Sequence, residues 1–240
     1  MKPTLIVISG PNGAGKTTFA RALITSRLPN NFEFLNADLI ADALSPFKPQ
    51  SVAIAAGKEF LRRFDDWVLR KKSFLIETTL SSLTLRHRLV KARSEGYRIE
   101  IIYIALPDSE FAVERVSQRV KLGGHDIPGQ TIRRRFVRSI KNFNSIYLQL
   151  SDASVLLDGK TKRPSRVASW RSGMLSQVFD ADSLSKYMDP RLEAEEQVAF
   201  YDAQNFVFID CVDQAARDVE RFLSRLEVSS GVPLIVNSGN

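Results

Sequence analysis

The 240-residue sequence predicts an α/β fold built on a three-layer, doubly wound, mainly parallel sheet. Short apolar runs alternate with longer segments of helical periodicity over the first two thirds of the chain. Several of these runs are nearly continuous in apolar residues, as is typical of parallel strands covered on both faces. A glycine-rich loop joins the first run to the first helical segment. Such alternation favours right-handed crossovers, with helices on both sides of the sheet.

Five strands and five intervening helices are expected. The strands are Thr4–Ser9, Phe32–Asn36, Ser73–Thr78, Arg98–Ala105 and Ser154–Leu157. The helices are Gly15–Arg27, Gln50–Lys71, Thr84–Glu95, Ser109–Leu122 and Gln130–Leu150. In the second helix one apolar stripe is predicted from near-helical spacing, formed by Ile54, Phe60, Leu61, Phe64 and Val68. Gly96 follows the third helix, where a C-cap glycine belongs.

The rhythm changes after Gly159. The stretch Lys160–Arg166 is basic, and Val167–Asp189 shows no clear period. Further on, helices are expected at Arg191–Asp202 and Asp213–Leu226, with a strand at Phe206–Asp210. We therefore expect a core domain over residues 1–160 and a C-terminal extension over residues 161–240 that packs on it.

Composition limits the class of protein. A net charge of +7 and a pI near 9.6 favour acidic partners such as phosphates, nucleic acid or a membrane surface, although the charge can serve merely to hold a polyphosphate. The single cysteine, Cys211, excludes an internal disulfide framework and a cysteine-rich metal site. No apolar stretch approaches the ~20 residues of a membrane helix. We expect a soluble, cytoplasmic protein with no membrane association.

The strongest motif is a phosphate-binding P-loop between the first strand and the first helix. It consists of Gly10, Pro11, Asn12, Gly13, Ala14, Gly15, Lys16 and Thr17, with Thr18 next in the helix. Its glycines allow backbone N–H groups to approach phosphate oxygens, and the helix adds the positive end of its dipole. Lys16 is expected to contact the β- and γ-phosphates and Thr17 to bind Mg²⁺. The chain should therefore bind a nucleoside triphosphate, either ATP or GTP.

Polar residues follow two later strands at the sheet edge where ligands of open α/β folds bind. Asp38 is either the cap of a helix starting near Leu39 or a general base for an acceptor hydroxyl. Glu77 follows three apolar residues that are expected to be buried, so its carboxylate needs a hydrogen-bonding partner or a function. It would orient the acceptor, bind Mg²⁺ through water, or pair with a cation. Thr78 and Thr79 add hydroxyls there, or reflect β propensity alone.

A basic segment follows the fourth strand. Its cations are Arg115, Arg119, Lys121, Arg133, Arg134, Arg135, Arg138 and Lys141, around a glycine-containing loop at 123–129. Arginines beside such a loop can close over a triphosphate, or can form a solvated helix face, which is the better reading of Arg115, Arg138 and Lys141. At most two of the three consecutive arginines can face one site. Nucleic acid is not an expected partner, because the segment lacks interleaved stacking aromatics and the chain carries no recognised nucleic-acid module. With two histidines, His125 among them, a triad or metal cluster is not expected.

The order of these motifs resembles the zeta-toxin family of P-loop kinases. The resemblance runs from about Leu5 to Gly159 through the P-loop, Asn-Ala-Asp, Ile-Glu-Thr-Thr, the Gly-Gly-His-Asp-Ile-Pro loop and an Arg-Arg-Arg-Phe helix. It implies a P-loop kinase fold that transfers phosphate from ATP, with Mg²⁺, to a sugar hydroxyl of UDP-N-acetylglucosamine. It also implies a possible antitoxin partner, although the chain shows no antitoxin segment and nothing after Lys160 matches.

The resemblance also assigns roles to individual residues. Lys16 matches the phosphate lysine and Thr17 the metal threonine. Asp38 matches the general base and Glu77 the acceptor-holding glutamate. Arg119 matches the first phosphate-clamping arginine; the second lies within Arg133–Arg135, and Arg134 is our choice.

Two functions remain open at this point. The first is an ATP-dependent kinase acting on a small-molecule hydroxyl, with a nucleotide sugar as one possible acceptor. The second is a P-loop NTPase that uses the nucleotide as a switch and binds nucleic acid or a protein partner. The net charge and the unassigned last third of the chain motivate this alternative.

Overall fold

A computed structural model of the chain describes residues 2–26, 28, 32–124 and 126–188. His125, Cys211 and the elements expected at Arg191–Asp202, Phe206–Asp210 and Asp213–Leu226 lie outside the described residues. The assignment of residues 161–240 to an extension therefore stays a prediction.

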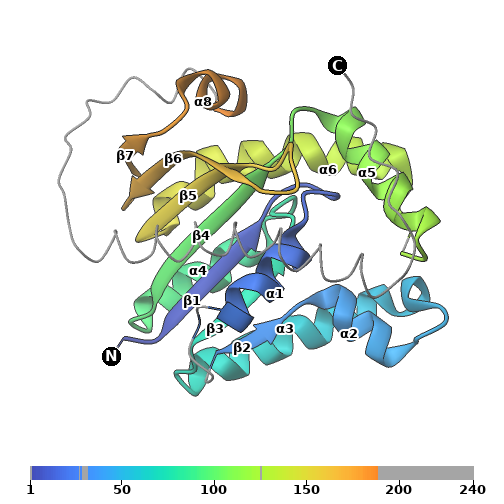
Figure 1. Cartoon of the computed structure of the whole chain (residues 1–240). Coiled ribbons are helices and arrows are strands. Elements are labelled where there is room, and N and C mark those ends of the chain that lie inside the picture. The colour runs from blue at the N-terminus through green and yellow to red at the C-terminus, as the bar shows by residue number, and fades with distance from the viewer. Residues whose placement is uncertain (1, 27, 29–31, 125, 189–240) are drawn as a thin grey trace.

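The described part of the chain forms one seven-stranded sheet with the order β2-β3-β1-β4-β5-β6-β7 (Figure 1). Its strands are β1 (Thr4–Ser9), β2 (Glu33–Leu35), β3 (Phe74–Thr78), β4 (Arg98–Ala105), β5 (Ala153–Asp158), β6 (Ser165–Arg171) and β7 (Met174–Val178). The first five run parallel, while β6 and β7 are antiparallel to their neighbours. The expected doubly wound, mainly parallel α/β fold is confirmed.

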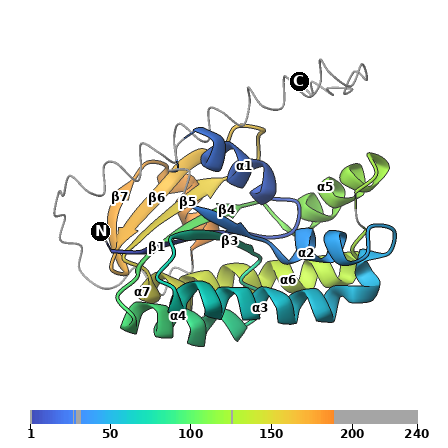
Figure 2. The same cartoon turned by 90° about the horizontal axis from the view of Figure 1, so that it is seen from below.

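Helices cover both faces of this sheet. They are α1 (Lys16–Ser26), α2 (Ala37–Leu44), the 3₁₀ turn η1 (Pro49–Val52), α3 (Ala53–Leu69), α4 (Thr84–Ser94), α5 (Ser109–Lys121), α6 (Gly129–Asn142), the π-helical turn η2 (Phe143–Tyr147), α7 (Leu148–Leu150) and α8 (Ala181–Tyr187). Figure 2 shows α3, α4 and α6 on one side of the sheet and α1 on the other. The two sides form two separate apolar cores.

Strand β1 shows why its apolar run is continuous. Leu5 and Val7 pack in one core, and Ile6 and Ile8 pack in the other. Alternate side chains of a strand point to opposite faces, so a strand covered on both faces needs apolar residues at every position. The parallel arrangement also places the carboxyl ends of β1 to β5 at one edge, where the polar residues that follow them can meet.

Three details differ from expectation. Ile54 is 79% exposed, and the buried stripe of α3 is Ala56, Phe60, Phe64 and Val68. Ile54 precedes Ala56 by two residues, or about 200° around a helix, so the two point to nearly opposite sides. The helix expected over Gln130–Leu150 contains the π-helical turn η2.

The third difference is the hairpin β6–β7, which lies in the stretch with no clear period. Positions 167–170 of β6 are all buried, so the strand carries no alternation of apolar and polar residues. The connection is Ser172–Gly173, with φ of 47° and 81°. Two consecutive left-handed residues are typical of a tight hairpin turn. This Ser-Gly pair is the local sequence signal of the hairpin.

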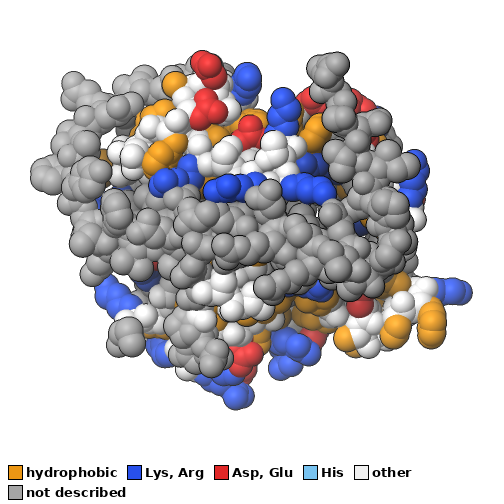
Figure 3. All heavy atoms as spheres, in the orientation of Figure 1, with side chains coloured by type: hydrophobic (Ala, Val, Ile, Leu, Met, Phe, Trp, Pro, Cys, Tyr) orange, Lys and Arg blue, Asp and Glu red, His pale blue; other side chains and the backbone are white. Residues whose placement is uncertain are grey.

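The surface carries an apolar group of side chains over α2 and the turn after it, visible in orange at the lower right of Figure 3. Leu39, Leu44 and Phe47 are exposed there. Among the described residues, no helix combines the length and the apolar character that a membrane crossing requires.

Candidate active site

The P-loop connects β1 to α1 through three glycines with positive φ: Gly10 (139°), Gly13 (81°) and Gly15 (81°). A Cβ on Gly10 would collide with the backbone carbonyl of Ile104 in β4, so the chain can pass close to this strand only without a side chain. Lys16 follows, buried in the first turn of α1, and its Nζ donates to the carbonyl oxygen of Pro11 at 2.8 Å.

Four charged side chains lie within electrostatic reach of Lys16. Burial lowers the pKa of its ammonium, while Glu77 and Asp38 act to raise that pKa and Arg119 and Arg135 to lower it further. Lys16 is thus a buried ammonium near two carboxylates and two guanidinium groups. Such a site favours an anionic ligand, whose negative charge would offset the excess positive charge. The folded chain thus brings the P-loop together with residues from α2, β3, α5 and α6.

Glu77 joins the P-loop to β2. It lies beside Ile8 in the parallel register of β3 with β1. The Thr17 hydroxyl donates to its carboxylate, 3.0 Å from Oε1 and 2.9 Å from Oε2. Asn36 Nδ2 donates to the same carboxylate at 2.6 Å. Glu77 thus accepts hydrogen bonds from an alcohol and an amide, which compensate its partial burial without neutralising its charge.

Asn36 is a site residue to which the sequence analysis assigned no role. Its Oδ1 accepts from the backbone N–H groups of Asp38 (2.7 Å) and Leu39 (3.2 Å), so Asn36 is the N-cap of α2. The alternative that Asp38 caps this helix is wrong, because Asp38 lies in the first turn with its side chain exposed. The preference of Asn for N-cap positions was a signal for this assignment.

A cleft of about 510 Å³ opens at this edge of the sheet. Its lining includes the following predicted site residues: Asn12, Gly13, Lys16, Thr17, Asp38, Glu77, Thr78, Thr79 and Arg119. Gly10, Pro11, Ala14, Gly15 and Thr18 do not line it; they shape the loop or begin the helix behind it. The cleft therefore contains a phosphate-binding loop, two carboxylates and an arginine, which together suit phosphoryl transfer.

Arg135, and not Arg134, lines the cleft, so the choice of Arg134 is corrected to Arg135. Consecutive helical residues point about 100° apart. Arg135 shares a helix face with the buried residues Ile132 and Ser139, three residues before it and four after it. Arg134 is exposed, and Arg133 binds the Glu110 carboxylate through two hydrogen bonds of 2.6 and 2.7 Å.

Arg115 does not belong to a freely solvated face. Its guanidinium donates to the carbonyl oxygen of Lys160 at 2.8 Å and lies 4.8 Å from the centre of the Phe111 ring. Arg138 and Lys141 are exposed, as the solvated-face interpretation predicts. Arg115 thus ties α5 to the loop after β5. It also lies beside Gly13, where an added Cβ would be 3.1 Å from the Arg115 Cβ.

The loop after β3 supplies lining residues that the sequence analysis did not select. Ser81, Ser82 and Thr84 follow Thr78 and Thr79 along the cleft. Three side chains from α6 and η2 hold this loop through its backbone carbonyls. Ser139 Oγ donates to Thr79 (2.5 Å), Asn142 Nδ2 to Leu80 (2.7 Å) and Tyr147 Oη to Ser82 (3.0 Å). These contacts join positions about 60 residues apart, so no local pattern reveals them.

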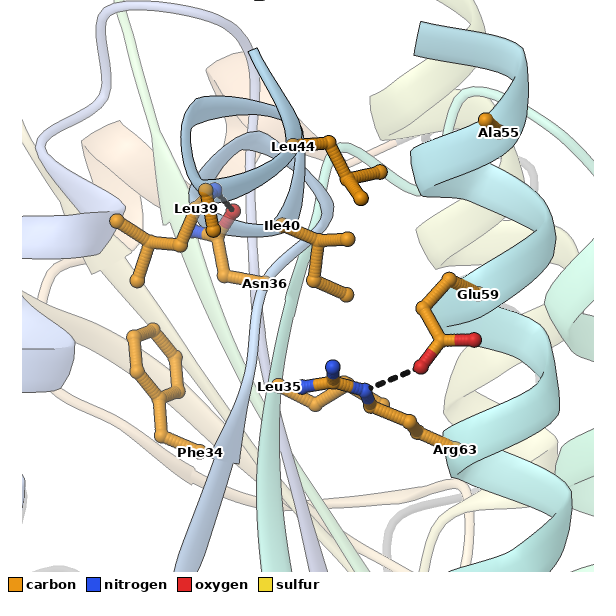
Figure 4. Close-up of a pocket in the computed structure, with 10 residues that line it drawn as sticks. Phe34, Leu35, Asn36, Leu39, Ile40, Leu44, Ala55, Glu59 and Arg63 are labelled. Atoms are coloured by element: carbon orange, nitrogen blue, oxygen red, sulfur yellow. Dashed lines mark hydrogen bonds and ion pairs between the residues drawn. The ribbon is translucent and has the colours of Figure 1, made fainter. Parts of the chain in front are cut away.

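A second cavity of about 430 Å³ lies between β2, α2 and α3 (Figure 4). Its wall is mostly hydrocarbon, from side chains such as Phe34, Ile40 and Leu44. Arg63 and Glu59 form an ion pair of 2.7 Å at its edge. Asn36 also borders it, but the amide of Asn36 already binds Glu77 and the start of α2. This cavity lacks the phosphate-binding groups of the cleft, which we take as the candidate active site.

Comparison with known proteins agrees with this geometry. The family model described as Zeta toxin matches residues 1–163. An uncharacterised protein of Haemophilus influenzae is 28% identical over 136 residues, which are 57% of this chain and 94% of the relative.

Solved structures share the fold. The PezAT chromosomal toxin–antitoxin system of Streptococcus pneumoniae contains a chain similar to this one at a TM-score of 0.58 and 15% identity, over 91% of this chain and 88% of that chain. A chain of the AvrRxo1-ORF1:AvrRxo1-ORF2 complex with sulphate ions is similar at 0.60 and 18%, over 92% and 76%. The same complex with ATP matches at 0.57 and 19% over the same shares. The chain belongs to the Zeta toxin family and is an ATP-dependent P-loop kinase.

Proposed function

We propose that this kinase transfers the γ-phosphoryl group of ATP to a hydroxyl of a small molecule, with Asp38 as general base. One observation carries the proposal: the P-loop lysine, the exposed carboxylate of Asp38 and a row of hydroxyl side chains after β3 line the same cleft. An NTPase that transfers phosphate to water needs no acceptor surface of this kind.

The residues divide the reaction between them. Asp38 accepts the proton of the acceptor hydroxyl, whose oxygen forms the new bond to the γ-phosphorus. The bond from that phosphorus to the β–γ bridging oxygen breaks, and ADP leaves. Lys16 offsets negative charge on the phosphates, and Arg119 with Arg135 offsets charge on the moving phosphoryl group. Glu77, held by Thr17 and Asn36, keeps the first turn of α1 and the ends of β2 and β3 in a fixed arrangement.

The donor set suits Mg²⁺ as well. This ion takes hard oxygen ligands, commonly one or two from protein and the rest from phosphates and water. The Thr17 hydroxyl and the Glu77 carboxylate are oxygen donors already within hydrogen-bonding distance of each other beside the phosphate site. When bound there with ATP, Mg²⁺ would offset charge on the β- and γ-phosphates.

Our proposals for the acceptor and for the protein partner are taken from the resemblance to the zeta-toxin family. UDP-N-acetylglucosamine or a related nucleotide sugar is the acceptor it implies, and an antitoxin is the partner. The PezAT system and the two-component AvrRxo1 complexes support a protein partner by analogy. The existence of an antitoxin is tested by measuring growth when this chain is induced alone and when it is induced together with a neighbouring small reading frame.

The kinase assay uses the full chain with radiolabelled ATP, Mg²⁺, and either UDP-N-acetylglucosamine or a polar metabolite extract. We expect a labelled product whose formation falls by at least about 100-fold in Asp38→Asn. Asp182→Asn is the matched control, since Asp182 also lies exposed in the first turn of a helix, away from the cleft. Equal labelling by Asp38→Asn and wild type would refute the base assignment. ATP hydrolysis without any labelled acceptor would favour the nucleotide switch.

A further inference from the structure

One face of α6 carries both a cleft arginine and the hydrogen bonds that hold the loop after β3. Arg135 lines the cleft, and Ser139 and Asn142 follow it four and seven residues later, at the spacing of neighbours on one helix face. Ser139 Oγ donates to the backbone carbonyl of Thr79, a residue that itself lines the cleft. Asn142 Nδ2 donates to the carbonyl of Leu80. One helix therefore connects the arginine to a loop that lines the same cleft.

The π-helical turn η2 extends this contact along the loop. The Leu148 N–H donates to the carbonyl oxygen of Phe143, five residues earlier, which is the hydrogen bond of a π-helix. Residues five apart lie about 140° apart around an α-helix, but a turn that closes over five residues brings them toward one side. Asn142 and Tyr147 stand in this relation, and Tyr147 Oη donates to the Ser82 carbonyl at 3.0 Å. The wider turn thus lets both side chains reach the same loop.

Tyr103 of β4 anchors this face of α6 to the sheet. Its hydroxyl lies 2.8 Å from Ser139 Oγ, and both side chains are buried. Ser139 has one hydroxyl hydrogen, which goes to the Thr79 carbonyl, because a carbonyl oxygen can only accept. Tyr103 must therefore donate to Ser139. Burial raises the pKa of the Tyr103 hydroxyl, so the phenol keeps its proton at neutral pH. An ordered chain of hydrogen bonds thus runs from β4 through α6 to the loop after β3.

This chain of hydrogen bonds holds a backbone conformation that is locally unfavourable. Leu80 follows Thr79 and has a left-handed backbone (φ 54°), with a side chain that is 1% exposed. Such a conformation is costly for a residue with a branched side chain and persists only where surrounding contacts impose it. The buried hydroxyls of Tyr103 and Ser139 in turn need their partners, because an unpaired polar group in the core costs free energy. The loop and α6 are therefore fixed relative to each other.

We propose, on the basis of the kinase function above, that Ser139 is a positioning residue for phosphoryl transfer. Through its bonds with Tyr103 and Thr79 it sets where α6 lies against the loop after β3, and so where Arg135 reaches into the cleft. Arg135 offsets charge only if its guanidinium meets the moving phosphoryl group, and misplacement of a positioning group by about 1 Å can cost about 100-fold in rate. Ser139 does not line the cleft, so it acts through Arg135.

The test follows turnover of γ-labelled ATP by the full chain with Mg²⁺ and UDP-N-acetylglucosamine or the metabolite extract. We expect Ser139→Ala to lower kcat by about 10- to 100-fold and to leave the Kd for ATP within about twofold, since the P-loop is unchanged. Wild-type kcat in Ser139→Ala would overturn the proposal.

Ser151→Ala is the matched control. Ser151 is also buried, its hydroxyl donates to the Leu148 carbonyl at 2.8 Å, and it lies 2.6 Å from the Ser154 hydroxyl. It precedes the amino end of β5, away from the cleft. Its loss should leave kcat within about twofold of wild type, because no residue of the cleft depends on it. An equal fall of kcat in both serine variants would show a general loss of stability and overturn the proposal.

A double-mutant cycle tests whether Ser139 acts through Arg135. In an Arg135→Ala background, Ser139→Ala should lower kcat by no more than about twofold further. The same fall in both backgrounds would overturn the proposal. Tyr103→Phe removes one hydroxyl with little change in packing, and it tests the same chain if Ser139→Ala does not fold. We expect it to lower kcat by about 3- to 10-fold, again only while Arg135 is present.

Failure of the kinase proposal gives a different result. If wild type hydrolyses ATP and labels no acceptor, the proposed transfer to a small molecule is wrong. The same variants measured by ATP hydrolysis then still test the positioning role of Ser139, because Arg135 would offset charge on the phosphoryl group in either reaction.

Discussion

Replacing Asn36 by alanine should destabilise the protein through two separate contacts. The side chain is 5% exposed, caps α2 through Oδ1, and donates to the Glu77 carboxylate at 2.6 Å through Nδ2. Loss of an N-cap costs about 1 kcal/mol. Loss of a hydrogen bond to a charged group costs about 1.5–3 kcal/mol. We therefore expect the free energy of unfolding of Asn36→Ala to fall by about 2.5–4 kcal/mol.

A second substitution separates the two contacts. Asn36→Asp keeps a good N-cap but replaces the donor to Glu77 with a second carboxylate. Two adjacent carboxylates raise the pKa of at least one of them above its unfolded value. A carboxyl with a raised folded pKa destabilises the fold at pH values above its unfolded pKa, and this loss disappears as the pH falls below that value. The deficit of Asn36→Asp should thus be large at pH 7 and shrink toward about pH 4.

Urea unfolding of the full chain, followed by circular dichroism at both pH values, measures these changes. Asp108→Ala is the matched control. Asp108 caps α5 by accepting from the Phe111 N–H at 2.8 Å, and this hydrogen bond is exposed, so its loss should cost only the ~1 kcal/mol of a cap. If Asn36→Ala loses no more stability than Asp108→Ala, the contact with Glu77 contributes nothing and the reasoning fails.

Three further predictions concern charged residues. Lys16→Met should weaken ATP binding by at least about 30-fold by calorimetry, since it removes the buried ammonium of the P-loop, which donates to the Pro11 carbonyl and is expected to bind phosphate; an unchanged Kd would contradict this role. Arg135→Ala should lower kcat by about 1,000-fold, whereas Arg134→Ala should stay within about twofold, and the reverse order would restore the original choice. Burial raises the pKa of Glu100 despite its ion pair with Arg98, so the contribution of Glu100 to stability should decline as the pH rises above 4.5, the ordinary value of a glutamate. In urea titrations, the free energy of unfolding of Glu100→Gln should therefore rise relative to that of the wild type as the pH rises above this value, and parallel curves would refute the reasoning.

Most of the fold follows from local patterns. The buried strands are recognisable because strands covered on both faces need apolar side chains at every position, as β1 has. The P-loop is recognisable because its glycines must adopt positive φ, as Gly10, Gly13 and Gly15 do. The hairpin β6–β7 was not recognised, because the buried run 167–170 of β6 includes the polar Ser169 and so forms neither a continuous apolar run nor an alternation of apolar and polar residues.

The sequence by itself determined the parallel α/β sheet, the P-loop with Lys16 and Thr17, and the choice of Asp38 and Glu77 as candidate residues, both of which line the cleft. All of these depend on short-range spacing and on a fixed order of strand, loop and helix. Only the tertiary structure decided that Asn36 links Glu77 to α2, that Arg135 rather than Arg134 reaches the cleft, and that α6 holds the hydroxyl row after β3. Those facts depend on strand register and on the rotation of each helix about its axis. Both are set by packing between residues far apart in the chain, which local spacing does not record.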